Sequence, residues 1–250
     1  MAGHSKWANI KHRKARQDAA RSKAFTKIIR ELTVSAREGG GDPGSNPRLA
    51  LAVSNAKTAN MPKDNIERAI KKGTGELEGE SYEEVTYEGY GPGGVAYFVE
   101  CTTDNNTRTV SEIRHAFSKH GGNMGTNGSV AYLFEQKGII TIKSDGLEED
   151  EVMLAAIDAG ADDLKSEEDY FEITTTREML YAVRIALESA GYTLDNAELQ
   201  YVPATEVEVS DELALSNLKL MEKLEDNDDV TNVFTNMKMS DSVMNVAENM

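Results

Sequence analysis

The chain contains little cysteine and no long apolar run. Cys101 is the one cysteine in 250 residues, which excludes an intramolecular disulfide and a thiolate zinc site. It follows the apolar run 95–99, so we expect a buried strand residue and not a nucleophile. No apolar stretch approaches the length of a membrane span and no signal peptide opens the chain, so we expect a cytoplasmic protein with no membrane partner.

Motifs for catalysis and cofactor binding are also scarce. The sequence has no P-loop, no metalloprotease helix and no Ser/His/Asp spacing typical of a triad. GYGPGG (89–94) fits the dinucleotide pattern G-x-G-x-x-G, but a strand follows it and a proline lies inside it, so we expect a hairpin turn. His115 and His120 are too poorly aligned on a helix to share a metal ion. We predict no catalytic residue, no metal and no cofactor.

The charge of the chain is distributed very unevenly. Residues 1–75 carry 16 basic and 6 acidic residues, a net charge of +10, although the whole chain has a net charge of −16. Residues 76–250 therefore have a net charge of −26. Such asymmetry predicts a nucleic acid or another anionic surface as the partner of the basic part.

The basic segment has the pattern of an amphipathic helix. At roughly 100° per residue, five cations fall within about a quarter-turn of one another: Arg16, Lys23, Lys27, Arg30 and Arg37. Five apolar residues lie opposite them: Phe25, Ile28, Ile29, Leu32 and Ala36. This pattern predicts an apolar face toward a core and a cationic ridge that faces outward.

A basic arm from His4 to Lys14 precedes this helix and contains a single aromatic residue, Trp7. Lys and Arg neutralise phosphates and Trp can stack on a base, so the arm favours nucleic acid over a membrane or a calmodulin-like partner. A solvated basic face without a ligand is the alternative. The predicted nucleic-acid-binding residues are Lys6, Trp7, Lys11, His12, Arg13, Lys14, Arg16, Lys23, Lys27 and Arg30.

The first 75 residues read as a three-helix bundle. The loop GGGDPGSNP (39–47) ends the first helix, and Asn46 with Pro47 opens a second. A third helix starts at Pro62 and stops at Gly73. We expect a basic helical nucleic-acid-binding domain at 1–75.

The rest of the chain alternates strand-like and helical patterns. Residues 138–204 follow the order β-α-β-β-α-β of a ferredoxin-like unit. The helix expected at 211–224 and the strand-like stretch 230–239 have no partner there, so we pair them with the strands and helix of 80–135, which include a strand at 129–134. The prediction is an α+β protein with a discontinuous α/β domain (80–135 plus 205–240), an inserted ferredoxin-like domain (136–204) and a flexible tail (241–250).

One basic segment interrupts the acidic part of the chain. In TTDNNTRTVSEIRHAFSKHGGNMG (102–125), polar residues precede a helix that two glycines end. A capped helix between two strands explains most of this pattern. A second nucleic-acid contact is the other interpretation, with Asn105, Asn106, Arg108 and Arg114 as its residues.

Long motifs across nearly the whole chain resemble the YebC/PmpR family. They are GHSKWANIKHRK, KAFTKIIREL, NMPKDNIERAIKKG, YEGYGPGGVA, TDNNTRTVSEIRHAFSKHGGNMG, GSVAYLF and REMLYAVRIALESAGY. The resemblance implies a three-domain α/β protein and a regulator of gene expression. Members are described as DNA-binding transcriptional regulators, and others resemble translation factors that act on ribosomes at proline-rich stretches.

We therefore expect a non-enzymatic nucleic-acid-binding regulator. Its target is either DNA or ribosomal or transfer RNA, and the absence of a helix-turn-helix signature favours a structured RNA. The competing hypothesis is an adaptor whose acidic α/β domains bind a basic protein, and an enzyme ranks third. The sequence does not indicate an oligomeric state.

Overall fold

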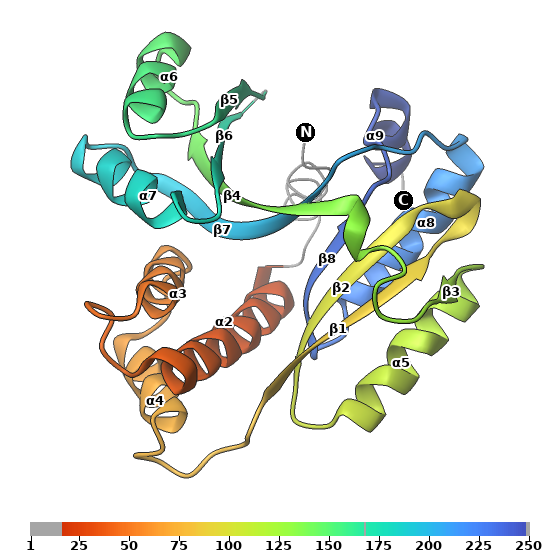
Figure 1. Cartoon of the computed structure of the whole chain (residues 1–250), viewed down its shortest axis with the longest axis horizontal. Helices are drawn as coiled ribbons and strands as arrows, with labels where there is room; N and C mark the ends of the chain where they lie inside the picture. The colour runs from red at the N-terminus through yellow and green to blue at the C-terminus, as the bar shows by residue number, and fades with distance from the viewer. Residues whose placement is uncertain (1–16, 168, 249–250) are drawn as a thin grey trace. The chain divides into compact units, whose positions relative to one another are not determined.

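A computed structural model describes residues 17–167 and 169–248 (Figure 1). The chain divides into two compact units, each built from separated segments. The first unit combines the described residues up to Glu31 with 79–135 and the described residues from Val202 onward, and the second unit combines 32–78 with 136–201. The predicted domain boundaries themselves stay predictions.

The amino-terminal region is helical, as its sequence predicts. Its helices are α2 (Gln17–Gly39), α3 (Pro47–Thr58) and α4 (Lys63–Gly73). The Asn46 side chain accepts a hydrogen bond from the Leu49 N–H and so caps α3, and Pro47 occupies the first turn, where its missing N–H costs nothing. Gly73 ends α4 close to α2, because a Cβ there would lie 2.3 Å from the Thr33 carbonyl oxygen.

The first unit contains a four-stranded antiparallel sheet in the order β3-β1-β2-β8. Its strands are β1 (Glu83–Tyr90), β2 (Ala96–Thr103), β3 (Asn123–Met124) and β8 (Val230–Thr235). β8 pairs with β2 although more than a hundred residues separate them, which confirms the discontinuous domain. Pro92–Gly94 joins β1 to β2 in the expected hairpin, with positive φ angles at Gly93 and Gly94.

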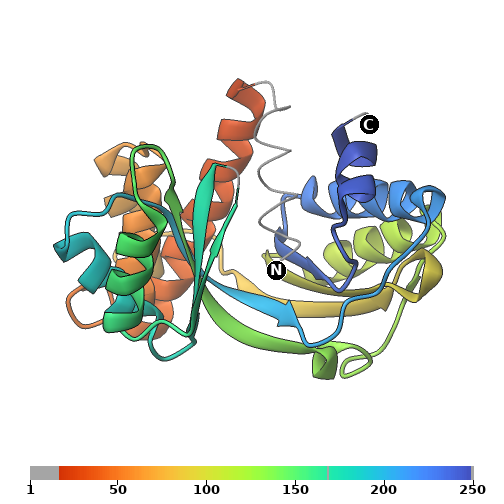
Figure 2. The same cartoon turned by 90° about the horizontal axis from the view of Figure 1, so that it is seen from above.

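Helices α5 (Asn106–Lys119) and α8 (Asp211–Glu225) cover one face of this sheet (Figure 2). Their apolar residues meet the strands in one core, in which the rings of Tyr97 and Phe117 pack edge to face at 5.8 Å. Each fully buried large side chain contributes about 1.5–3 kcal/mol relative to exposure. Cys101 is buried in this core as predicted, and burial raises the pKa of its thiol to about 12.

The carboxyl-terminal segment is more ordered than the flexible tail predicted for 241–250. Residues Asp241–Glu248 form helix α9, and the four-residue spacing of Val243 and Ala247 places both in the core of the first unit. The sequence pattern does not predict this helix, because a helix of two turns contains too few apolar positions to establish a period.

The second unit contains the ferredoxin-like fold. Its elements run β4 (Phe134–Lys143), α6 (Glu149–Asp158), β5 (Asp163–Ser166), β6 (Tyr170–Thr176), α7 (Leu180–Ser189) and β7 (Leu194–Pro203). The sheet order is β5-β6-β4-β7, so the predicted β-α-β-β-α-β unit is confirmed. Ile140, Ile173 and Val183 are fully buried between this sheet and its helices.

The strand predicted at 129–134 is replaced, up to Leu133, by a loop and a short 3-10 helix, η2 (Ala131–Leu133), and β4 begins at Phe134. The Glu88 carboxylate, 3% exposed, accepts hydrogen bonds from the backbone N–H groups of Gly128, Val130 and Ala131. Burial alone would raise the pKa of Glu88, but these N–H groups outweigh it and hold the pKa below its usual value. Because a carboxylate takes these donors, they do not join a strand ladder.

Candidate nucleic-acid interface

Seven of the ten predicted nucleic-acid-binding residues, those of the arm together with Arg16, lie outside the described part of the chain. These are Lys6, Trp7, Lys11, His12, Arg13, Lys14 and Arg16. Three predicted cations, Lys23, Lys27 and Arg30, lie on the described part of α2 and belong to the first unit. Their placement determines what the predicted ridge can do.

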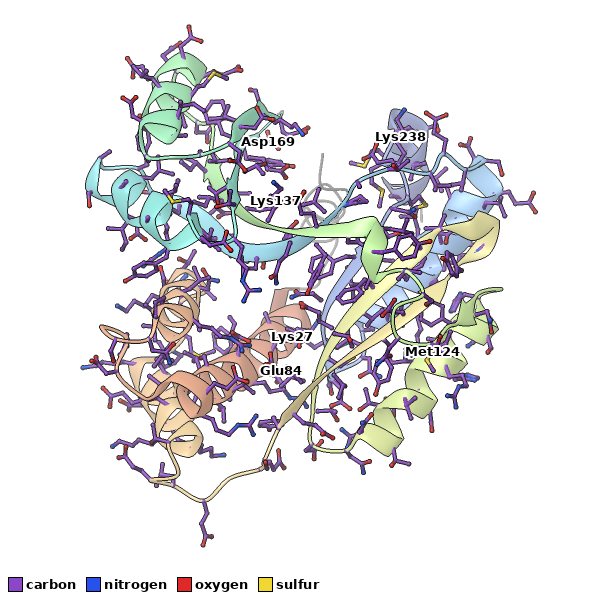
Figure 3. The ribbon with its side chains drawn as sticks, in the orientation of Figure 1. Lys27, Glu84, Met124, Lys137, Asp169 and Lys238 are labelled. Carbon is purple, nitrogen blue, oxygen red and sulfur yellow. The ribbon has the colours of Figure 1, made fainter. Side chains whose placement is uncertain are left out.

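Lys23 and Lys27 contact the carboxyl end of α8. The Lys23 ammonium lies 3.2 Å from the Asp226 carboxylate, and both side chains are nearly half exposed. The Lys27 ammonium (Figure 3) donates to the Glu225 carbonyl oxygen at 3.2 Å. The last carbonyl groups of a helix lack partners in the helix and carry partial negative charge, so cations at this end are stabilising.

Arg30 is bound still more firmly within the protein. Its Nη1 donates to the carbonyl oxygens of Thr102 and Asp228, at 2.9 and 2.5 Å, and lies 3.0 Å from the Asp229 carboxylate. Its side chain is 13% exposed, and the guanidinium also lies over the Tyr82 ring at 5.2 Å. The outward ridge predicted from helical spacing is therefore wrong at Arg30, since the protein's own acidic turn covers that position.

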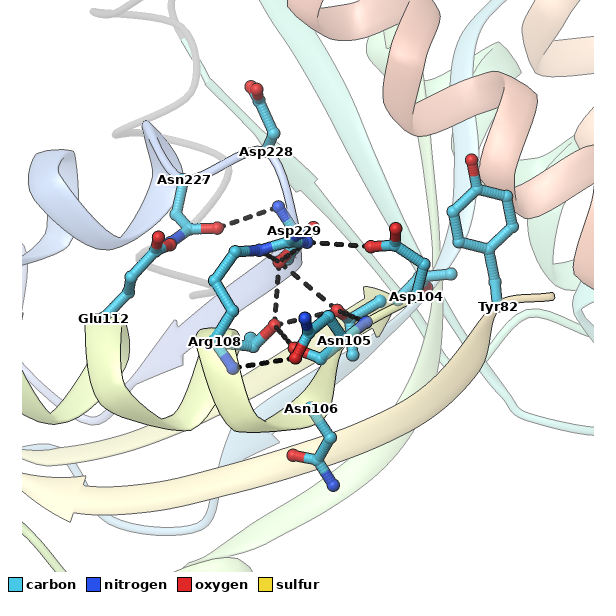
Figure 4. A network of polar contacts seen from close by, with 12 residues as sticks. Tyr82, Asp104, Asn105, Asn106, Arg108, Glu112, Asn227, Asp228 and Asp229 are labelled. Carbon is cyan, nitrogen blue, oxygen red and sulfur yellow. Dashed lines mark hydrogen bonds and ion pairs between the residues drawn. The ribbon is translucent and has the colours of Figure 1, made fainter. Parts of the chain in front are cut away.

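Asp229 is the centre of this polar network (Figure 4). Its carboxylate, 3% exposed, accepts hydrogen bonds from Arg108 at 2.6 Å and from the Thr109 hydroxyl at 2.7 Å, on the oxygen opposite the one that Arg30 contacts. Burial alone would raise the pKa of Asp229, but the donors from Arg108, Thr109 and Arg30 outweigh it and lower the pKa. The network therefore stabilises an ionised carboxylate between two arginines.

The four residues predicted for a second contact do not form one binding surface. The Asn105 side chain caps α5 by accepting from the Arg108 N–H at 3.0 Å, and Asn106 accepts from the Tyr87 hydroxyl at 2.6 Å. Arg108 binds Asp229 and Asp104. Arg114 is exposed and makes no ion pair with any described residue. The first three thus hold the start of α5, which favours the capped-helix interpretation of this motif.

Sequence reasoning missed exposed cations on α3 and α4. Lys57, Arg68, Lys71 and Lys72 are exposed, and none forms an ion pair within the described residues. Arg68 and Lys72 are one helical turn apart and so share a face. The signal was present in NIERAIKKG, where Ile66 and Ala69 are buried and the cations occupy other positions of the helix, 68, 71 and 72.

The described residues contain neither a candidate metal site nor a candidate membrane span. No group of three or more His, Cys, Asp or Glu side chains lies close enough to hold a metal ion among residues 17–167 and 169–248. In the same ranges, no helix has the length and apolar character of a membrane span. The contacts of the polar network around Asp229 are all made within the first unit and are structural.

These features define an α+β protein that joins a basic helical region to acidic sheet domains. Two family models match it: "TACO1/YebC protein N-terminal domain" at residues 5–76 and "TACO1/YebC second and third domain" at residues 82–237. The chain belongs to the TACO1/YebC family, as its motifs predict.

Curated relatives and a crystal structure agree with this assignment. A "Probable transcriptional regulatory protein" of Pseudomonas fluorescens is 58% identical over 244 residues, which cover 97% of this chain and 98% of the relative. One of the same description from Persephonella marina is 56% identical over 246 residues, 98% of each chain. The crystal structure of a conserved hypothetical protein from Aquifex aeolicus superimposes with a TM-score of 0.84 at 50% identity, covering 88% of this chain and 91% of that one. The relatives thus support a regulatory protein of this type.

Proposed function

We propose that this protein is a cytoplasmic, non-enzymatic regulator of gene expression that binds nucleic acid through its basic amino-terminal region. The observation that carries the proposal is the separation of charge, with +10 in residues 1–75 and −26 in the remainder. A nucleic acid gains from contacts with the first part and is repelled by the second. The basic region is therefore the main phosphate-binding part of the chain, and any cationic surface in the remainder must overcome the negative charge around it.

The described cations divide this region into two kinds of surface. Arg68, Lys71 and Lys72 on α4 are exposed without ion-pair partners among the described residues, so their charge is available to a phosphate. Lys23 and Arg30 are already engaged by Asp226 and Asp229. We therefore assign the phosphate contacts to the arm, from Lys6 to Arg16, and to the outer face of α4.

Two targets fit this chemistry. A transcriptional regulator would bind DNA, as the names of the relatives suggest for those proteins. A ribosome-associated translation factor would bind ribosomal or transfer RNA and relieve stalling at proline-rich stretches, as the family resemblance implies. We favour the RNA target, because a small cationic region on an acidic body suits a pocket in a ribonucleoprotein and avoids the repulsion that a long duplex exerts.

A binding assay on the full chain tests the electrostatic part of the proposal. If about five phosphates are contacted, the logarithm of affinity should fall with the logarithm of salt concentration with a slope near −4 to −5 on a duplex, and less on single strands. Arg13→Glu, Lys14→Glu and Arg16→Glu together should abolish most of the binding. The control variant combines Lys143→Glu, Lys165→Glu and Arg177→Glu in the second unit. It changes the net charge by the same amount and should leave the affinity for nucleic acid nearly unchanged. A flat salt response would contradict the proposal.

Ultraviolet crosslinking in cells, followed by purification and sequencing of the attached nucleic acid, identifies the target. Ribosomal or transfer RNA fragments that disappear in the arm variant would support the translation factor. Enriched promoter DNA would support the transcriptional regulator. Recovery of neither, from a wild-type protein present at its normal level, would count against nucleic-acid binding altogether.

A second candidate function is that of an adaptor for a basic protein, and one surface favours it. Met153, Leu154 and Ile157 on α6 are 36%, 64% and 47% exposed, beside the acidic run Glu149–Glu151. An apolar patch with an acidic border fits a partner that presents an apolar side chain flanked by lysine or arginine. If the protein is such an adaptor, a basic protein should crosslink to this face of α6. The variant Leu154→Gln with Ile157→Gln should lose that crosslink, and the arm variant should keep it.

A further inference from the structure

An unassigned cationic surface lies where α5 and α8 run side by side in the first unit. Arg108 at the start of α5 binds Asp229, which follows α8, and the Asn227 side chain donates to Glu112 at 2.6 Å. The two helices therefore run antiparallel from this point, and both cover the same face of the sheet (Figure 2). Positions further along α5 consequently lie opposite earlier positions of α8.

Three lysines and two histidines line this seam. They are His115, Lys119 and His120 at the end of α5, and Lys219 and Lys223 on α8. All but the partly buried His120 are exposed. Burial lowers the pKa of His120, and the charges of Lys119, Lys219, Lys223 and His115 lower it further, in agreement with the packing of the end of α5 against α8. The seam thus brings together cations that are about a hundred residues apart in the sequence.

The three lysines, like Arg114 on α5, form no ion pair within the described residues of the first unit. No ion pair or side-chain hydrogen bond joins any of the five seam side chains to another described residue. By contrast, Lys23, Arg108 and Lys238 are each paired with a carboxylate of their own unit. In a chain with a net charge of −16, acids are plentiful, so a cluster of cations without acidic partners is best explained by an external anion.

The surroundings of the seam indicate the class of that anion. None of the large apolar side chains that are exposed in the described chain lies on α5 or α8. A protein interface needs buried apolar or aromatic contacts at its centre, and a membrane surface needs apolar side chains to insert. A phosphate backbone needs neither, because cations alone neutralise it, without regard to base sequence.

We propose that the α5/α8 seam binds the phosphate backbone of a nucleic acid, as a contact separate from the amino-terminal arm. The proposal rests on the nucleic-acid-binding function proposed above and adds a second site to it. Lys219 and Lys223 are one helical turn apart, about 6 Å along the axis, and so are His115 and Lys119. These two rows of side chains, one on each helix, offer several contacts to the phosphates of one nucleic-acid strand that lies along the seam. Of the second contact predicted from the sequence, Asn105, Asn106 and Arg108 lie at the opposite end of α5 and are engaged in the structure. Its fourth residue, Arg114, is exposed and directly precedes His115 in α5.

The test uses the full-length protein with Lys119→Glu, Lys219→Glu and Lys223→Glu. Binding is measured by fluorescence anisotropy against a labelled single-stranded RNA of mixed sequence and a DNA duplex of the same length, over a range of salt concentrations. We expect affinity for at least one probe to fall tenfold or more, and its salt slope to become shallower by about 2 on single strands. The matched control is Lys143→Glu, Lys165→Glu and Arg177→Glu, which makes the same change in net charge and should have a small effect.

Further variants separate this proposal from the proposed function. If Arg13→Glu, Lys14→Glu and Arg16→Glu abolish binding and the seam variant binds as the wild type does, the seam is overturned and the function stands. If the wild type binds neither probe, the function and the seam both fail. Seam-dependent binding only to vesicles of anionic phospholipid would also overturn the proposal. Lys119→Gln, Lys219→Gln and Lys223→Gln remove charge without adding acids, so a parallel loss of affinity in this variant, with unchanged thermal unfolding, excludes misfolding as its cause.

Discussion

The cations of α2 and those of the α5/α8 seam belong to the same unit but have opposite surroundings. Lys23, Lys27 and Arg30 meet the acidic turn that follows α8, and Arg30 is largely removed from water. Lys219 and Lys223 lie on the second half of the same α8, Lys223 in its last turn, and form no ion pair with a carboxylate of the described chain. The positions of lysine and arginine in the sequence therefore do not show which of these cations stabilise the fold and which are available to a ligand.

The largest loss of stability should come from removing the Asp229 carboxylate, which binds Arg30. Asp229→Ala leaves two arginines without their buried partner, and breaking a buried ion pair in this way costs about 3–5 kcal/mol. Arg108 is 42% exposed and can turn to water, so we expect the lower part of this range. Urea unfolding measures the loss. Asp228→Ala, next in the chain, is the control and should cost little, because only its backbone carbonyl contacts Arg30.

The next effect tests the contrast between the two sets of cations directly. Arg30→Ala leaves Asp229 with Arg108 and Thr109 but removes three contacts, and should lower the free energy of unfolding by about 2 kcal/mol. Lys219→Ala, on an exposed position without a counter-charge, should change it by less than about 0.5 kcal/mol. Equal losses in the two variants would remove the distinction between a structural and an available cation.

Acid should unfold the first unit through the carboxylates that are held ionised. The pKa of Asp229 and that of Glu88 are both below their ordinary values in the folded protein. Their contribution to stability is therefore present above the ordinary carboxyl pKa of about 4 and is lost as the pH falls through the lower folded values. We expect the urea midpoint to fall steadily below about pH 4, and Asp229→Asn to flatten this dependence. A midpoint that rises on acidification would contradict the assignment.

Much of the fold could be predicted from the sequence, because it follows from local patterns. The caps at Asn46 and Asn105, the hairpin at 89–94 and the order of elements in 138–204 each depend on neighbouring residues. The pairing of β8 with the strands of 80–135 is also predictable, because the ferredoxin-like unit has no place for another strand. The strand predicted at 129–134 failed because its backbone donors are taken by Glu88, which is far away in sequence.

The candidate site was less predictable, for the same physical reason. Helical periodicity showed that Lys23, Lys27 and Arg30 share a face, but it contains no information about which segment covers that face. The turn at 225–229 covers it, nearly two hundred residues later. The seam could not be found from sequence either, since Lys119 and Lys219 are brought together only by the antiparallel packing of α5 on α8.

A smaller loss of stability should follow from breaking the exposed ion pair between Lys23, toward the start of α2, and Asp226. Lys23 and Asp226 are each nearly half exposed, and surface pairs of this kind contribute about 0–1 kcal/mol because water and salt screen them. Asp226→Asn should thus lower stability slightly at low ionic strength and not at all at high ionic strength. A loss as large as that of Arg30→Ala would show that the whole acidic turn acts as one unit.

The most sensitive probe of the seam is the titration of His120, followed by NMR. Its pKa is below the ordinary histidine value, first through burial and then through the field of the surrounding cations. Lys219→Ala or Lys223→Ala should raise this pKa, since each removes a positive charge that disfavours the imidazolium. Added salt should act in the same direction by screening, and a bound polyanion should raise the pKa further because it favours the protonated ring. A His120 pKa that responds to neither substitution nor salt would show that burial alone sets it, and that the cations of α5 and α8 are too far apart to act on one strand.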